Sequence, residues 1–224
     1  MTLEIFLRIA WVQIILSAIA SVMSVIYFKR RSMEARLAGL TFSFGVITYI
    51  CIAIIDPKGK NINIPQAIES IFYFLGVTTL FSVALRKRYR PLFFTAAILF
   101  TIFSILNLSF IQKNEVNTYS RVIGAMFIIV YGILYCYRLL IDLPAQHLQR
   151  VPMFWFNSGI LIYNAGSLFL LLFAPYLVEV LHNDLLIYWS FHNIFNSIQT
   201  LIVMIGLWQD LRNTKSLSSS PSAP

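Results

Sequence analysis

The chain has 224 residues, of which 58% are hydrophobic and only 12% are charged, and its mean hydropathy is +0.76. A soluble domain could not bury so much apolar surface, so the composition excludes a soluble protein and indicates an all-α integral membrane protein. Lys and Arg outnumber Asp and Glu by 17 to 9, but no basic groove with interleaved aromatic residues accompanies the excess, so we expect the lipid bilayer and no nucleic acid as a partner.

Apolar segments that are long enough to cross a bilayer, about 20 residues each, recur along the whole chain. They cover residues 7–28, 37–55, 65–85, 92–111, 120–140, 153–177 and 185–208. We therefore predict a single seven-helix transmembrane domain over residues 1–210. The connections are short, and residues 211–224 end in the polar stretch SLSSSPSAP, which predicts a disordered cytoplasmic tail.

Basic residues cluster in alternate connections. Most of them follow the first, third, fifth and seventh segments, and few lie on the other side. Because positive residues stay on the cytoplasmic side, this bias predicts an N-terminus outside and a C-terminus inside. The expected location is the inner cell membrane, crossed several times.

Two parts of the chain resemble each other. The residues Phe42, Gly45 and Tyr49 match Phe156, Gly159 and Tyr163 at equal spacing, and "ESIF" from Glu69 aligns with "HNIF" from His192. This predicts a parallel 3+1+3 repeat, as in some sugar and vitamin carriers, in which the fourth segment is a connector. A few matches among apolar residues also arise by chance.

Several polar side chains lie inside the apolar segments, where each one costs free energy. In the last segment Trp189, His192 and Asn196 share one helical face. With residues of four other segments they form the predicted ligand-binding set of an outward-facing pocket: Gln13, Glu69, Asn107, Asn164, Trp189, His192 and Asn196. Asn164 and Asn196 should lie near mid-membrane and could meet there. The alternative is that these side chains join helices by hydrogen bonds.

A metal site has weaker support. Glu69 and His192 are its only candidates in the membrane, and no HxxxH or HExxH spacing accompanies them. His182 lies in an outer connection and His147 on the opposite side. Glu69 could instead pair with Arg121. We predict no particular cofactor.

The segments "TYSRVIGAMFIIVYGILYCYRLL", "VPMFWFNSGILIYNAGSLFLLLF" and "YWSFHNIFNSIQTLIVMIGLW", together with "PQAIESIFYF", resemble a bacterial seven-transmembrane family without an assigned function. Some of its members look similar to the membrane sensor modules of histidine kinases. The resemblance implies functional positions at Glu69, Trp189, His192 and Asn196. It also implies a departure at Gly124, where the family often has a second acid, and a small void is expected there.

These observations predict a receptor-like or sensory protein that binds a small ligand or protons and signals to a separate cytoplasmic partner. The alternative is a small-solute transporter of 3+1+3 architecture. A metal-dependent membrane hydrolase and a structural or assembly protein are further interpretations, and an enzyme is not expected.

Overall fold

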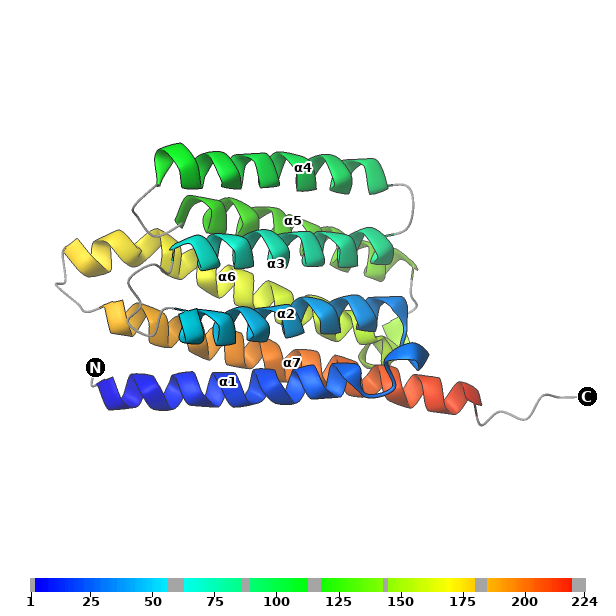
Figure 1. Cartoon of the computed structure of the whole chain (residues 1–224). Coiled ribbons are helices and arrows are strands. Elements are labelled where there is room, and N and C mark those ends of the chain that lie inside the picture. The colour runs from blue at the N-terminus through cyan, green and yellow to red at the C-terminus, as the bar shows by residue number, and fades with distance from the viewer. Residues whose placement is uncertain are drawn as a thin grey trace, which may run out of the picture.

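The structure, a computed structural model, describes residues 3–55, 63–85, 89–112, 118–142, 145–179 and 185–218, and these form an all-helical bundle (Figure 1). Within the described residues there are seven α-helices, each overlapping one predicted segment, which confirms the predicted all-α class. They are α1 (Leu3–Val25), α2 (Met33–Ile55), α3 (Asn63–Ala84), α4 (Arg90–Leu106), α5 (Thr118–Asp142), α6 (Pro152–Glu179) and α7 (Leu185–Ser218).

Five of these helices, α1, α3, α4, α5 and α6, are long and apolar enough to cross a membrane, as judged over the described residues. Large apolar side chains cover their outer faces, among them Trp11, Phe94, Phe110, Leu140 and Phe169. Such continuous apolar surface suits lipid rather than water. The structure therefore supports a membrane protein, while seven spans and the direction of insertion stay predictions.

Consecutive helices run in opposite directions along the bundle (Figure 1). Six of them form a closed ring of neighbours in the order α1, α2, α3, α5, α6 and α7, and α4 packs outside this ring against α3 and α5. If α1, α2 and α3 are exchanged with α5, α6 and α7 respectively, the order of neighbours in the ring stays the same. The arrangement is thus compatible with the predicted 3+1+3 repeat, which itself stays a prediction.

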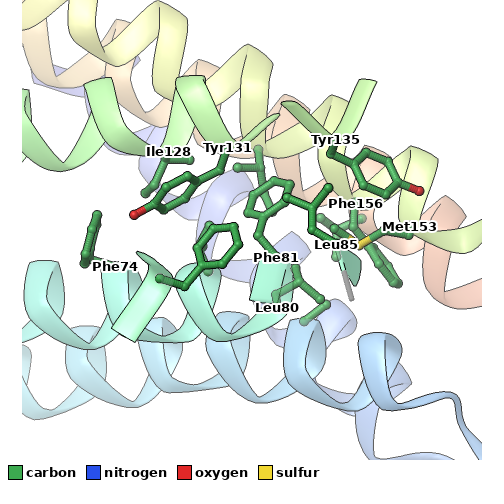
Figure 2. Close-up of a cluster of buried hydrophobic side chains, with 14 of the residues drawn as sticks. Phe74, Leu80, Phe81, Leu85, Ile128, Tyr131, Tyr135, Met153 and Phe156 are labelled. Atoms are coloured by element: carbon green, nitrogen blue, oxygen red, sulfur yellow. The ribbon is translucent and has the colours of Figure 1, made fainter. Parts of the chain in front are cut away.

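Aromatic and aliphatic side chains fill the half of the bundle toward which α3, α5 and α7 run (Figure 2). Phe81 of α3, Tyr131 and Tyr135 of α5 and Phe156 of α6 are all buried there. Phe93 of α4 meets Tyr131 edge to face, with 4.7 Å between the ring centroids. Such packing of large rings stabilises a helix bundle by dispersion and by ring geometry together.

A buried arginine closes the same end of the bundle. α1 ends where Tyr27 adopts a left-handed backbone with a φ of 56°, and Arg31 follows with 2% of its surface exposed. Its guanidinium donates hydrogen bonds to the carbonyls of Met23 and Ile26 at the end of α1 and to the Leu207 carbonyl inside α7. The first two bonds satisfy carbonyls that a helix end leaves without partners.

Arg31 also faces a buried acid. Asp210 of α7 is 3% exposed, and its Oδ2 lies 3.5 Å from Arg31 Nη1. Asp210 Oδ1 accepts a hydrogen bond of 3.4 Å from the Ser32 amide at the start of α2. Burial lowers the pKa of Arg31, and the Asp210 carboxylate opposes that shift. We call these two side chains the Arg31–Asp210 latch, because they join α1, α2 and α7.

The predicted tail needs a correction, because α7 continues as a helix to Ser218 rather than ending near residue 208. The added turns are held against the bundle. Asp210 belongs to the latch, and the Asn213 side chain donates a 2.9 Å hydrogen bond to the Arg150 carbonyl. The rest of the predicted disordered tail, residues 219–224, lies outside the described residues.

Candidate functional site

A polar cavity of about 110 Å³ lies between the helices on the side of the bundle from which α3, α5 and α7 start. Every helix contributes to its wall. One lining residue from each of α1 to α7, in order, is Gln13, Gly45, Glu69, Phe100, Arg121, Asn164 and His192. The buried rings of Phe74 and Phe100, stacked with centroids 3.9 Å apart, separate the cavity from the hydrophobic core.

Five of the seven predicted ligand-binding residues line this one cavity. They are Gln13, Glu69, Asn164, His192 and Asn196. The chain thus gathers polar groups that are far apart in sequence, which is the geometry of a binding site. Whether they bind a ligand stays a prediction.

Trp189 is not among the lining residues of the cavity, and its predicted role in ligand binding stays a prediction. Its ring meets His192 edge to face, with 5.6 Å between centroids. It also lies under the Arg121 guanidinium, whose central carbon is 5.8 Å from the ring centroid. Trp189 therefore supports two lining residues, because its large amphipathic ring fills the space beside them.

Asn107 is also not among the lining residues, and its predicted role stays a prediction. At this residue α4 passes into a π-helix, Asn107–Ile111. Asn107 is fully buried and donates hydrogen bonds to Gln112 Oε1 at 3.0 Å and to Ser120 Oγ at 3.2 Å. Gln112 Oε1 in turn accepts from the Tyr119 amide. Asn107 thus joins α4 to the start of α5, and its hydrogen bond to Ser120 connects it to a residue that lines the cavity.

Two opposite charges border the cavity. Glu69 Oε2 of α3 and Arg121 Nη2 of α5 are 3.9 Å apart. The side chains retain 25% and 14% exposure respectively. Both lie within the first two turns of their helices, and α3 and α5 start on the same side. The expected pairing of Glu69 with Arg121 is therefore present inside the predicted pocket, so the two interpretations of Glu69 hold together.

The hydroxyl of Tyr73 joins three helices at the cavity wall. It accepts hydrogen bonds of 3.0 Å from Asn164 Nδ2 of α6 and from Gln199 Nε2 of α7. Asn164 also donates to the Ile160 carbonyl at 2.7 Å. One interpretation expected Asn164 to meet Asn196. In the structure the side chain of Asn164 bonds to Tyr73 instead. Asn164 joins helices, as the alternative expected, while it lines the cavity, and Gln199 does the same.

His192 lies in an aromatic environment. Its Nε2 is 3.5 Å from the Tyr163 hydroxyl oxygen, and the two rings meet edge to face at 5.5 Å. Among the described residues no three His, Cys, Asp or Glu side chains form a group that could hold a metal ion. His182 and the side chain of His147 lie outside the described part of the chain, so the metal interpretation gains no third ligand here.

Gly124, where a small void was expected, lines the cavity. The space directly at its missing side chain is taken by aromatic rings, since a Cβ atom there would lie 3.1 Å from Phe100 Cε2 and 3.6 Å from Phe74 Cδ2. The space is more open at Gly45 of α2, where an added Cβ would meet nothing within 4 Å. Gly45 lines the cavity directly.

Sequence reasoning missed Arg121, Tyr73, Tyr163 and Ser167 as lining residues. Tyr163 was visible only as a member of the repeat, and Tyr73 follows Glu69 by one helical turn, a spacing that places both on one face. Ser167 is 6% exposed, and its hydroxyl has no hydrogen-bond partner among the described residues.

The comparisons with known proteins add no relative. No protein-family model, no curated protein and no solved structure matches this chain.

Proposed function

We propose that this protein is a seven-helix membrane receptor that binds a small ligand or protons in its polar cavity and signals to a separate cytoplasmic partner. The observation that carries the proposal is that all seven helices build the wall of one cavity. A ligand that fits one packing of the helices better than another shifts the population toward that packing. A wall made by every helix therefore links occupancy to the arrangement of the whole bundle.

The distribution of charge supports insertion with the cavity toward the outside. Among the described basic residues, those at the end that carries the latch are Lys29, Arg30, Arg31, Arg36, Arg90, Arg138, Arg150 and Arg212. Arg8 and Arg121 lie at the other end. By the positive-inside rule the latch end is cytoplasmic. Fusing green fluorescent protein or alkaline phosphatase to the C-terminus tests this, since a cytoplasmic end gives fluorescence without phosphatase activity. Phosphatase activity would show that the C-terminus lies outside, which is the opposite of the proposed orientation.

A screen on the purified full chain tests the receptor. We expect at least one small polar compound from a metabolite library to raise the melting temperature of the wild type. Gly45→Leu should abolish this rise, because the leucine side chain would occupy the open space beside Gly45. Ile47→Leu, at an exposed position of the same helix that does not line the cavity, is the matched control and should keep the response. Equal responses of the wild type and Gly45→Leu would refute the cavity as the binding site.

The alternative proposal is a small-solute transporter, and the ring order of the helices supports it. With α4 outside the ring, three helices precede it and three follow it, as a 3+1+3 carrier requires. Vesicles that contain the purified protein distinguish the two. If the protein is a receptor, the compound that it binds should not accumulate inside the vesicles. Uptake above that of protein-free vesicles would show that the protein is a transporter.

A further inference from the structure

We infer that the ligand of the cavity is a small zwitterion, a molecule that carries one ammonium and one carboxylate group as glycine does. This inference rests on the proposed function and names the chemical class that the same site would take. The argument uses the charges, the rings and the size of the cavity.

The charges come in one pair. Among the described lining residues Glu69 is the acid and Arg121 the Lys or Arg side chain, while the third titratable group of this kind, His192, is an imidazole. An anion alone would pair with Arg121 and be repelled by Glu69. A cation alone would pair with Glu69 and be repelled by Arg121. A zwitterion can satisfy both at once. The separation of 3.9 Å between Oε2 and Nη2 exceeds the 2.7–2.9 Å typical of a charge-assisted hydrogen bond, so these two atoms form an ion pair without a close hydrogen bond.

Neighbouring groups suit the two ends of such a molecule. The rings of Tyr73 and Tyr163 line the cavity near Glu69, with centroids 5.9 Å apart at 77°, and aromatic faces attract an ammonium group. The hydroxyl of Ser167, buried without a partner among the described residues, can donate to a carboxylate. A buried hydroxyl without a partner costs free energy, which a bound ligand would remove.

The volume suits a small ligand. An engineered cavity of about 150 Å³ holds benzene, so by proportion a cavity of about 110 Å³ surrounds roughly four or five non-hydrogen atoms. This matches glycine. Gly45 leaves the space open on the α2 side, where a side chain would otherwise enter.

Calorimetric titration of the purified full chain in lipid nanodiscs tests the inference. The probes are glycine, propionate, propylammonium and propionamide, which are similar in size and differ in charge. We expect glycine to bind roughly tenfold or more tightly than each of the others, because propionate and propylammonium each leave one of the two protein charges without a ligand group and the neutral propionamide leaves both. Leucine, also a zwitterion but larger, should bind more weakly than glycine.

Charge-neutral variants sharpen the test. Glu69→Gln should lose glycine binding and gain propionate binding, because only the cation remains. Arg121→Gln should lose glycine binding and gain propylammonium binding. A gained ligand shows that the variant is folded. Gly45→Leu should bind none of the probes, whereas Ile47→Leu, at an exposed position of the same helix outside the cavity wall, should bind glycine as the wild type does.

The outcomes separate this inference from the proposed function. If propionate or propylammonium binds the wild type as tightly as glycine and Gly45→Leu abolishes that binding, the zwitterion is overturned and the receptor stands. If no probe binds the wild type, as expected of a cavity that holds only water, the zwitterion is again overturned and the metabolite screen decides the receptor. If Gly45→Leu binds glycine as well as the wild type, both proposals lose their site.

Discussion

Replacing Arg31 by methionine tests the latch at the basic end of the bundle. The substitution leaves the Asp210 carboxylate, 3% exposed, without its cation. It also removes the donors to the carbonyls of Met23, Ile26 and Leu207. Breaking a buried ion pair by removing one partner costs about 3–5 kcal/mol, because the remaining charge stays buried. We therefore expect Arg31→Met to lower the free energy of unfolding by about that amount.

Unfolding of the purified chain in mixed micelles by added dodecyl sulfate, followed by circular dichroism, measures the effect. Lys29→Met is the matched control: Lys29 is exposed in the same connection, so its loss should change stability by less than about 0.5 kcal/mol. The double variant Arg31→Met, Asp210→Leu should recover at least about 2 kcal/mol, since no charge is left unpaired. An Arg31→Met protein within 1 kcal/mol of the wild type would refute the reasoning, because a buried guanidinium cannot be that easily removed.

Two further pairs of variants test the packing and the cavity wall in the same unfolding assay. Gly39→Ala should destabilise by about 1–3 kcal/mol, because its Cβ would lie 2.5 Å from Ser24 Cβ. Gly45→Ala in the same helix should stabilise by about 0.5–1 kcal/mol through helix propensity in open space; equal effects at the two sites would contradict this packing. Tyr73→Phe should cost about 1–3 kcal/mol, because it removes the acceptor of two buried amides. Exposed Tyr89→Phe should cost nothing measurable, and a similar loss in both tyrosine variants would contradict the role of the Tyr73 hydroxyl.

The helical fold could be predicted because lipid imposes a simple rule. A segment without water to bond its backbone must be helical, so apolar length alone identifies helices such as α1 and α6. The ends were harder, because a helix may continue past its apolar part. α7 does so to Ser218 through contacts that involve Asp210 and Asn213, and these depend on residues more than 60 positions away.

The cavity could be predicted in part for a related reason. A polar group in an apolar helix has to face the interior, so Glu69 and His192 were identified without knowledge of the packing. Tyr73 and Tyr163 were not, because tyrosine is common both in cores and at membrane interfaces. Arg31 was counted only as a topological charge. Its burial depends on the left-handed turn at Tyr27 and on Asp210, which no local pattern reveals.

The receptor proposal requires the cavity at one end of the bundle to be coupled to the latch at the other end. α7 has 34 residues, about 51 Å at 1.5 Å per residue, and it carries His192 at the cavity and Leu207 and Asp210 at the latch. A ligand that displaces α7 therefore has to alter the latch, and by reciprocity the latch has to alter ligand affinity.

Arg31 contributes no atom to the cavity wall, so its effect on binding isolates this coupling. We expect Arg31→Met to change the affinity for the compound found in the screen by about 5-fold or more, within the usual range of allosteric coupling. The titration is made well below the melting temperature of the variant, with Lys29→Met as the control. Affinity unchanged within twofold in a folded Arg31→Met protein would show that α7 does not transmit occupancy. The signal would then have to leave the cavity through α3 or α5, the helices that carry Glu69 and Arg121.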